Sequence, residues 1–345
     1  MLATTRQARR GAWWAVLAVG IGLIAAPAVF QMFDRAPKGG DMIAAFEPYM
    51  TPAEIQKFQG YMTEIDAAVT ETQQDVVPAV GGADPLADAP SVATLVDEWP
   101  GIDADMSDML ATMSADIDNY EAVAALPPFD LFPWFFVVPG VLLAGVAGYV
   151  LVRRPQRATA ARWLVGVVGV GLVLAPVAFQ MFERAPKGGE MIDDFRPLMT
   201  RPRVENIQGY FVTLGAGEGQ LRNDLVPAAV AAGAAESDFP AVTAFSEDWQ
   251  AIVTDFAPMI GVMSDNVVNF EAVDALPDFP LFPWFFVIPG VLVAGLAAVA
   301  LWSRPRSSDA DDEATDDRAI DVGPPESDDA SSPPNSPALS GKESS

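Results

Sequence analysis

Four long apolar segments alternate with polar stretches along the chain. None of the four contains Asp, Glu, Lys or Arg. The hydrocarbon core of a bilayer takes about 20 apolar residues, and lipid cannot hydrogen-bond to an open backbone, so the pattern predicts four transmembrane helices. These helices are expected at residues 12–33, 131–152, 163–182 and 281–302.

The first apolar segment also fits a cleaved signal peptide. It follows a basic stretch, and residues 26–28, Ala-Pro-Ala, resemble a small-residue cleavage site. The segment is long for a signal core, however, and a near-copy of it forms the third segment, 163–182. A transmembrane helix at both positions is the simpler interpretation.

The chain contains a tandem repeat. Residues 26–42 recur as residues 175–191 at an offset of 149, and residues 131–140 recur as residues 281–290 at an offset of 150. Each copy therefore consists of a span, a domain of nearly 100 residues and a second span. Because each copy has an even number of spans, both are expected to insert the same way up, related by a pseudo-two-fold axis along the membrane normal.

Charge orients the predicted spans. Residues 1–12 carry three bases and residues 153–162 carry four, in both cases without an acid, which places them in the cytoplasm by the positive-inside rule. Residues 34–130 carry 3 bases and 19 acids, and residues 182–280 carry 6 bases and 16 acids. These two acidic domains are therefore expected outside.

The chain ends in a segment rich in Asp, Ser and Pro that cannot bury a core and is predicted to be a disordered cytoplasmic tail. The composition, rich in Ala, Val and Asp, is typical of a high-GC bacterium or a halophile, so the membrane would be a bacterial plasma membrane. The predicted parts are a cytoplasmic N-terminus (1–11), a span (12–33), external domain 1 (34–130), a span (131–152), a cytoplasmic loop (153–162), a span (163–182), external domain 2 (183–280), a span (281–302) and the cytoplasmic tail (303–345).

Each external domain reads as a long helical hairpin, which makes the fold class an all-α integral membrane protein. Residues 51–54, Thr-Pro-Ala-Glu, are typical of a helix start, and apolar residues follow at helical spacing until Pro78 and the adjacent glycines. A second helix is expected over about residues 91–125, kinked at Pro100. Two such hairpins would form a four-helix bundle outside. The glycines at 215, 217 and 219 are expected to weaken the first helix of the second copy.

Composition excludes several kinds of chemistry. The chain has no Cys and no His and a net charge of −26. A disulfide, a thiol nucleophile and His-ligated zinc or haem are therefore excluded, and no cofactor is expected. Nucleic acid is not an expected partner, because binding phosphates requires a basic face.

A basic motif, Arg-Ala-Pro-Lys-Gly-Gly, follows the first and third segments. It carries Arg35 and Lys38 in the first copy and Arg184 and Lys187 in the second. These cations could hold lipid phosphates, with the glycines letting the backbone approach. The favoured interpretation is a tight structural turn in which the bases pair with neighbouring acids.

Aromatic and polar residues flank the second and fourth segments. Trp134 and Trp284 are interpreted as interface anchors, and a lipid-tail groove at the aromatic collar around them is the alternative. Four polar residues just before the aromatic collars are expected to cap or pair with the basic motif across the mouth of each hairpin. They are Asn119 and Glu121 and their counterparts Asn269 and Glu271.

Two sets of side chains were candidate metal ligands. Asp103, Asp105 and Asp108 could bind calcium, but only Asp105 has an acidic counterpart in the second copy and EF-hand spacing is absent. Methionine thioethers are soft ligands for Cu(I), although methionine also fills irregular helical cores, and core packing is the favoured interpretation. The recurring methionines are Met32, Met42 and Met50 with their counterparts Met181, Met191 and Met199.

The favoured function is a non-enzymatic membrane protein, an accessory subunit, scaffold or sensor, whose paired domains bind a protein partner or ligand outside, with membrane lipid as a further partner. The alternative is a component of a transporter, channel or lipid-handling assembly. The predicted spans lack the ionisable groups of coupled transporters, and Gln31 and Gln180 are the uncharged polar pair to consider as pore-lining. An enzyme acting on lipids would depend on carboxylates too abundant to mark a site.

Overall fold

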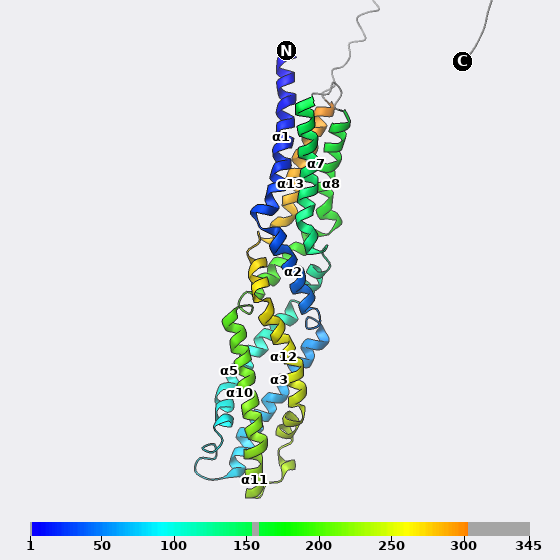
Figure 1. Cartoon of the computed structure of the whole chain (residues 1–345). Coiled ribbons are helices and arrows are strands. Elements are labelled where there is room, and N and C mark those ends of the chain that lie inside the picture. The colour runs from blue at the N-terminus through cyan, green and yellow to red at the C-terminus, as the bar shows by residue number, and fades with distance from the viewer. Residues whose placement is uncertain (1, 154–158, 303–345) are drawn as a thin grey trace, which may run out of the picture. The chain divides into compact units, whose positions relative to one another are not determined.

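A computed structural model describes residues 2–153 and 159–302, and this part of the chain contains helices and turns without strands (Figure 1). Predictions for the tail, 303–345, and for most of the cytoplasmic loop fall outside the described residues. The α-helices are α1 (Leu2–Val29), α2 (Met32–Phe46), α3 (Pro52–Glu71), α4 (Val77–Val80), α5 (Pro90–Ala115), α6 (Ile117–Ala124), α7 (Phe132–Arg153), α8 (Thr159–Ala178), α9 (Met181–Phe195), α10 (Arg201–Gln220), α11 (Val226–Ala232), α12 (Pro240–Asp274) and α13 (Phe282–Trp302).

Short irregular turns complete these helices. Each copy has one π-helical turn, η1 (Thr72–Val76) or η3 (Leu221–Leu225), at positions related by the offset of 149. Three 3₁₀ turns are η2 (Phe129–Leu131), η4 (Glu236–Asp238) and η5 (Phe279–Leu281).

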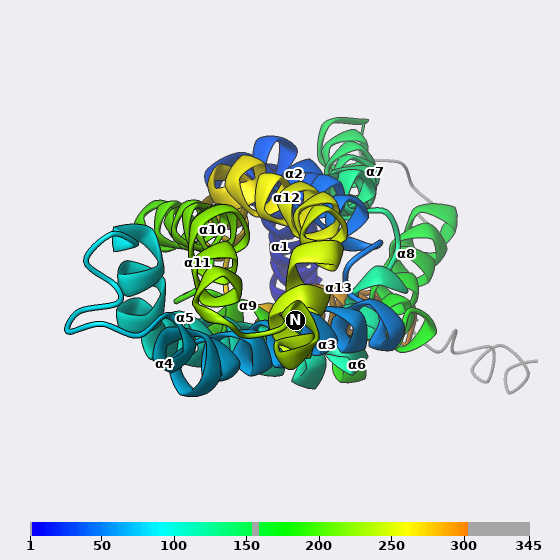
Figure 2. The ribbon, with the colours of Figure 1, turned by 90° about the horizontal axis from the view of Figure 1, so that it is seen from below.

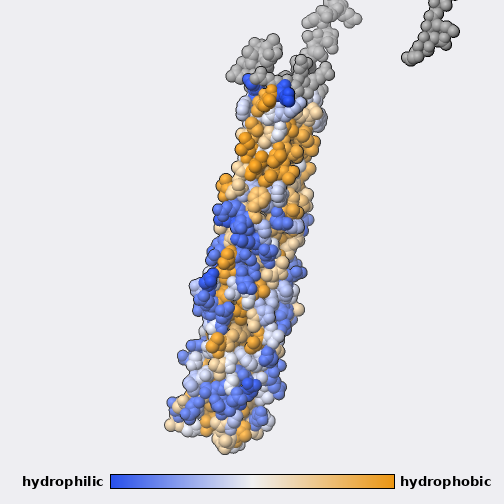
Figure 3. All heavy atoms as spheres, in the orientation of Figure 1, coloured by the Kyte–Doolittle hydropathy of each residue, from blue (hydrophilic) through white to orange (hydrophobic). Residues whose placement is uncertain are grey.

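Within residues 2–302 the helices form two groups (Figure 1). Helices α1, α7, α8 and α13 lie together, and the space-filling view shows apolar side chains over their surface (Figure 3). The mixed polar surface lies over the helices of the other group. The four apolar helices correspond in position to the four predicted spans.

Five helices in the described part of the chain are long and apolar enough to cross a membrane. Four of them are the apolar helices, and the fifth is α12, which belongs to the other group. The apolar window of α12 is the most buried of the five, with 39% of it inside the protein. The apolar residues of α12 can therefore be accounted for by packing in the protein core as well as by insertion into a membrane.

The chain turns earlier than predicted after the first and third apolar segments. Helices α1 and α8 end at Val29 and Ala178, and the chain reverses at Gln31 and Gln180, which have left-handed φ angles of 53° and 54°. Both glutamines are exposed at these turns, so neither lines a channel between the apolar helices.

The tight turn predicted at Arg35–Gly40 is therefore wrong, because this motif lies inside α2 and its counterpart lies inside α9. The glycines serve packing instead. A Cβ atom on Gly39 would lie 3.2 Å from Cδ1 of Phe129 and 3.3 Å from Cγ2 of Val273. Glycine thus lets α2 approach the ends of two other helical segments, one from each copy.

Helices α3, α5, α10 and α12 form a four-helix bundle (Figure 2), the arrangement expected for two helical hairpins side by side. Thr51 caps α3, since its Oγ1 accepts a hydrogen bond of 3.3 Å from the backbone N–H of Glu54. Thr200 caps α10 in the same way, accepting from the backbone N–H of Arg203 at 3.4 Å. Threonine before a proline-containing first turn determines where both helices begin.

Helix α10 runs unbroken through the glycines that were expected to weaken it. A Cβ on Gly217 would lie 2.5 Å from Cδ2 of Leu95, and one on Gly215 would lie 3.1 Å from Cζ2 of Trp249. The glycines therefore admit large side chains from two neighbouring helices. This packing offsets their low helix propensity.

Backbone contact at glycine joins the apolar helices in pairs, α1 with α7 and α8 with α13. A Cβ on Gly20 would lie 2.7 Å from the backbone nitrogen of Ala144, and one on Gly169 would lie 2.7 Å from that of Ala294. Small residues at such crossings allow close backbone approach and dense packing between apolar helices.

We predict that the double variant G20A/G169A is destabilised by roughly 1–3 kcal/mol, because each new methyl group meets backbone that must shift. Thermal unfolding of the purified protein in detergent would measure this. The matched control is G22A/G171A, since nothing lies within 4 Å of a Cβ at either position. Equal melting temperatures for the two double variants would contradict the proposed helix contact.

Candidate functional site

The two copies interlock, so each helix of the bundle contacts helices of both copies. Helix α3 packs against α5 of its own copy and α12 of the other, and α10 packs against α12 of its own copy and α5 of the other. Helix α2 lies along α12 (Figure 2), and its counterpart α9 lies along α6. Both copies therefore contribute to a long surface of contact between them, and the candidate site lies at this surface.

Reciprocal hydrogen bonds join the copies at the end of the bundle farthest from the apolar helices. Oε2 of Glu71, in the last turn of α3, accepts from the backbone N–H of Val242 at 2.7 Å. At the equivalent position, Oε1 of Gln220 accepts from the backbone N–H of Ser91 at 2.7 Å. Each copy therefore caps the first turn of the second long helix of the other copy.

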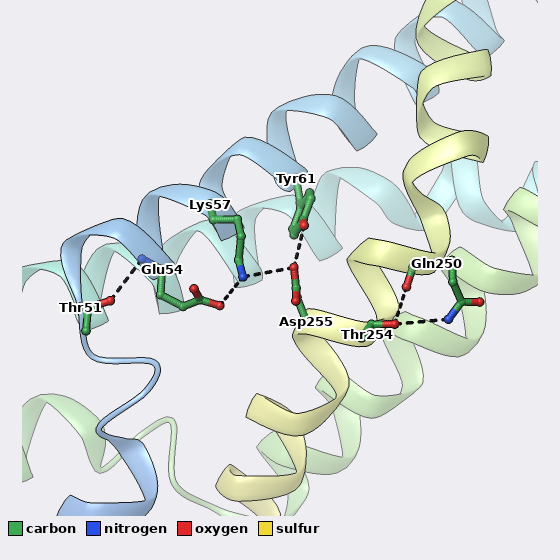
Figure 4. Close-up of polar contacts among 7 residues, drawn as sticks. All are labelled: Thr51, Glu54, Lys57, Tyr61, Gln250, Thr254 and Asp255. Atoms are coloured by element: carbon green, nitrogen blue, oxygen red, sulfur yellow. Dashed lines mark hydrogen bonds and ion pairs between the residues drawn. The ribbon is translucent and has the colours of Figure 1, made fainter.

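A second pair of contacts crosses between the copies in the middle of the bundle (Figure 4). Asp255 of α12 accepts a hydrogen bond of 2.7 Å from the hydroxyl of Tyr61 and pairs with Nζ of Lys57 at 3.2 Å. Lys57 also pairs with Oε1 of Glu54 at 2.6 Å. Lys57 and Tyr61 both come from α3, so α3 and α12 are joined by a small ionic network.

The equivalent contact joins α5 to α10. Asp105 accepts from the hydroxyl of Tyr210 and forms an ion pair with Arg203, whose other guanidinium nitrogen donates to the Asp105 carbonyl at 3.2 Å. These contacts favour the charged carboxylates. The tyrosine hydrogen bond first, and then the cation, lower the pKa of both Asp105 and Asp255, while hydrogen bonding to Asp255 and burial raise the pKa of Tyr61 to about 12.

The predicted basic residues make the third set of contacts, closest to the apolar helices. Arg35 donates to the backbone carbonyl of Ala275 at 2.7 Å, and Arg184 donates to that of Ala125 at 2.5 Å. Each arginine thereby caps the C-terminal end of a helix in the other copy, where a cation is favourable. Lys38 pairs with Asp34 at 3.0 Å, one helical turn away.

Lys187 is half-buried on α9, at the position equivalent to Lys38. The predicted role of these four cations in binding lipid headgroups stays a prediction.

The residues predicted at the hairpin mouth make local contacts. Asn119 donates to Asp116 at 2.8 Å, and Asn269 donates to Asn266 at 2.9 Å. Glu121 is exposed.

Glu271, at the position equivalent to Glu121, is exposed as well. The residues that cross the mouth of each hairpin are the arginines of α2 and α9, which bond to the other copy.

The predicted anchors Trp134 and Trp284 are each about half exposed, at 51% and 49%. Each makes an edge-to-face contact with a phenylalanine beside the turn of its own copy, at ring-centroid distances of 5.6 Å to Phe33 and 5.8 Å to Phe182. Exposed rings at this level of the apolar group are consistent with the interface role, which stays a prediction.

Three small apolar cavities lie along the line where the copies meet. One of them, of about 30 Å³, we call the axial cavity. Its lining consists of five pairs of residues at equivalent positions in the two copies. The pseudo-two-fold axis that relates the copies therefore passes through this cavity. The pairs are Met42 with Met191, Ile43 with Ile192, Phe46 with Phe195, Met50 with Met199 and Tyr120 with Phe270.

The other two cavities lie between the axial cavity and the apolar helices. One of about 10 Å³ shares Met42 and Met191 with the axial cavity, and one of about 20 Å³ is lined by Met32 and Met181. Both smaller cavities are lined by Phe129 and its counterpart in the second copy. The recurring methionines found in the sequence all line this row of cavities.

A buried carboxyl group lies one helical turn from the axial cavity in the first copy. The side chain of Asp116 is 1% exposed, and one of its oxygens is without a hydrogen-bond partner among the described residues. Burial raises the pKa of Asp116 above its ordinary value, and the neighbouring Asp194 and Glu190 raise it further. The equivalent residue in the second copy is Asn266, so a carboxyl group on one side of the cavity corresponds to an amide on the other.

The candidate calcium ligands do not converge. Asp105 is engaged by Arg203 and Tyr210, while Asp103 accepts a hydrogen bond from Ser107 at 3.2 Å. Asp108 is exposed on the same helix. No group of three or more His, Cys, Asp or Glu side chains with the geometry of a metal site occurs within residues 2–153 and 159–302.

Comparison of the chain with models of known protein families and with curated proteins finds no match.

Sequence reasoning missed the contacts between the copies. In the repeat, Tyr61 corresponds to Tyr210 and Asp105 corresponds to Asp255. These are polar residues that recur at equivalent positions on helix faces with an otherwise apolar pattern. Matched polar residues of this kind were the available signal. Spacing along one chain could not show that the tyrosine of each copy bonds to the aspartate of the other.

We predict that D105N/D255N loses about 1 kcal/mol of stability per site, because each change weakens a hydrogen-bonded and partly exposed ion pair. The control is D108N on the exposed face of α5. The lowered carboxyl pKa values stabilise the folded state above the ordinary value of 3.8, and this contribution is lost as pH falls through the lowered values. Acid unfolding should therefore depend less on pH in the double variant, and a profile identical to that of D108N would contradict the assignment.

Proposed function

We propose that this protein is a non-enzymatic multi-pass protein of a bacterial plasma membrane, whose two interlocked domains bind a ligand or protein partner outside the membrane. The observation that carries the proposal is the axial cavity, lined by five equivalent pairs from the two copies. A space shared so evenly by two copies is a natural place for one ligand to be bound by both.

The topology in this proposal has four spans, α1, α7, α8 and α13, with both termini in the cytoplasm. Helix α12 is assigned to the external bundle. Its Asp255 is paired with Lys57 and Tyr61 of α3, and it contacts α2 and α10 as well. A helix that carries an ion-paired aspartate and packs against several other helices is better suited to a bundle in water than to lipid.

Binding is favoured over catalysis because the carboxylates at the interface have structural partners. Asp105 and Asp255 hold the copies together and are kept ionised. General acid–base work usually requires a carboxyl pKa shifted toward the operating pH, which is the opposite direction. Asp116 has a raised pKa, but it is enclosed by packed helices.

A lipid-handling role is the second candidate. The row of apolar cavities begins beside Phe132 and Phe282, at the edge of the apolar helices, and continues toward the axial cavity. Membrane lipid is also the expected neighbour of Trp134 and Trp284. A transporter is less well supported, since Phe136 and Phe286 stack at a centroid distance of 4.4 Å between the apolar helix pairs.

The topology can be tested by labelling single cysteines, because the chain has none of its own. We predict that T63C in α3 and S264C in α12 react with a membrane-impermeant maleimide in intact cells, since both positions are exposed. T5C should react only after the membrane is permeabilised. Protection of S264C alone would make α12 a fifth span, and labelling of T5C in intact cells would reverse the orientation.

Binding can be tested by purifying the full chain in mild detergent and identifying what co-purifies. We expect a stoichiometric protein or small ligand that is retained by the wild type and retained less well when D105N/D255N weakens the contact between the domains. The control D108N should retain it. Conductance in liposomes without any bound partner would favour the transporter alternative and count against this proposal.

A further inference from the structure

Methionine is distributed unevenly between the two groups of helices. The chain has 13 methionines, and none lies in α1, α7, α8 or α13. These apolar helices are packed instead with Val, Leu, Ala, Gly and Phe. Apart from Met1, methionine is thus confined to the other group of helices and its turns, where some methionines pack in the bundle core and others line the row of cavities.

Four thioethers meet at the axial cavity. Met42, Met50, Met191 and Met199 line it, and their side chains are between 3% and 7% exposed. They form two pairs at equivalent positions, so each copy contributes the same two methionines to the lining of a shared space. Four soft donors from two related halves are a suitable set for a soft metal ion.

The size of the cavity limits what it can hold. A water molecule needs roughly 10–15 Å³ of such volume, and this cavity offers about 30 Å³. A space of this size can hold a single metal ion without its water shell. The lining is almost wholly apolar, so hard ions such as Ca²⁺ and Mg²⁺ would find no oxygen ligands there.

The surroundings favour a cation of low charge. Tyr120 and Phe270 lie on the lining, and aromatic rings attract cations through their faces. Burial first, and then the neighbouring Glu47, raise the pKa of the Tyr120 phenol to about 12. Asp116 lies one helical turn from Tyr120, and the exposed Glu190 and Asp194 of α9 act on it and add negative potential nearby.

We propose that Met42, Met50, Met191 and Met199 together bind one Cu(I) ion between the two copies. Thioether sulfur selects Cu(I) over hard divalent ions, and a chain without Cys or His has no other soft side-chain ligand. The inference rests on the proposed function and names the class of ligand, a soft monovalent metal ion.

The test uses the purified full chain in detergent, titrated anaerobically with Cu(I) in competition with a chromophoric Cu(I) chelator. We expect one Cu(I) per chain and a sulfur-only first shell by X-ray absorption. The variant M42L/M191L keeps the side-chain volume but removes two ligands. Since loss of an outer-shell partner alone weakens metal sites about 10–100-fold, this variant should bind at least about 100-fold more weakly.

The matched control is M109L/M259L, an equivalent pair that is fully buried in the bundle and does not line the cavity. It should bind Cu(I) like the wild type, and circular dichroism and size exclusion would show that both variants fold. The proposal is overturned if the wild type does not compete for Cu(I) or if both variants lose affinity equally. Retention of a protein partner without Cu(I) binding would overturn this inference and leave the proposed function intact.

Discussion

The structure depends on hydrogen bonds and packing that each copy makes with the other. The first turns of α5 and α12 are capped by side chains of the opposite copy, and the last turns of α6 and α12 receive an arginine from it. Helix ends leave unpaired backbone groups, and burying them without partners is costly. Several helix ends of each copy are therefore completed by side chains of the other copy.

The same interlocking explains why the axial cavity exists. Helices α2 and α9 bring equivalent side chains toward each other, and an axis of approximate symmetry forces like residues to meet. Large aromatic rings that face each other across the axis leave gaps between them. The flexible methionine side chains fill most of this space. The residual space is small, apolar and rich in sulfur.

Differences between the copies concentrate around this shared core. Asp66 accepts a hydrogen bond from Nε1 of Trp99 at 2.9 Å, whereas at the equivalent place Gly215 leaves room for the ring of Trp249. Asp116 is likewise replaced by Asn266. The tyrosine–aspartate contact between the copies occurs on both sides of the bundle, whereas the cation beside it comes from different positions, Lys57 in one copy and Arg203 in the other.

Sequence alone determined the apolar segments, the helical class, the offsets of the repeat and the threonine caps of α3 and α10, because these depend on local periodicity and neighbouring residues. Tertiary structure decided the turns at Gln31 and Gln180, the packing use of Gly217 and Gly39, and the exchange of partners between the copies. Contacts such as Tyr61 with Asp255 join residues nearly 200 positions apart, at a separation of 194. A repeat in the sequence is equally compatible with partners inside one copy or across two, and only packing in three dimensions distinguishes them.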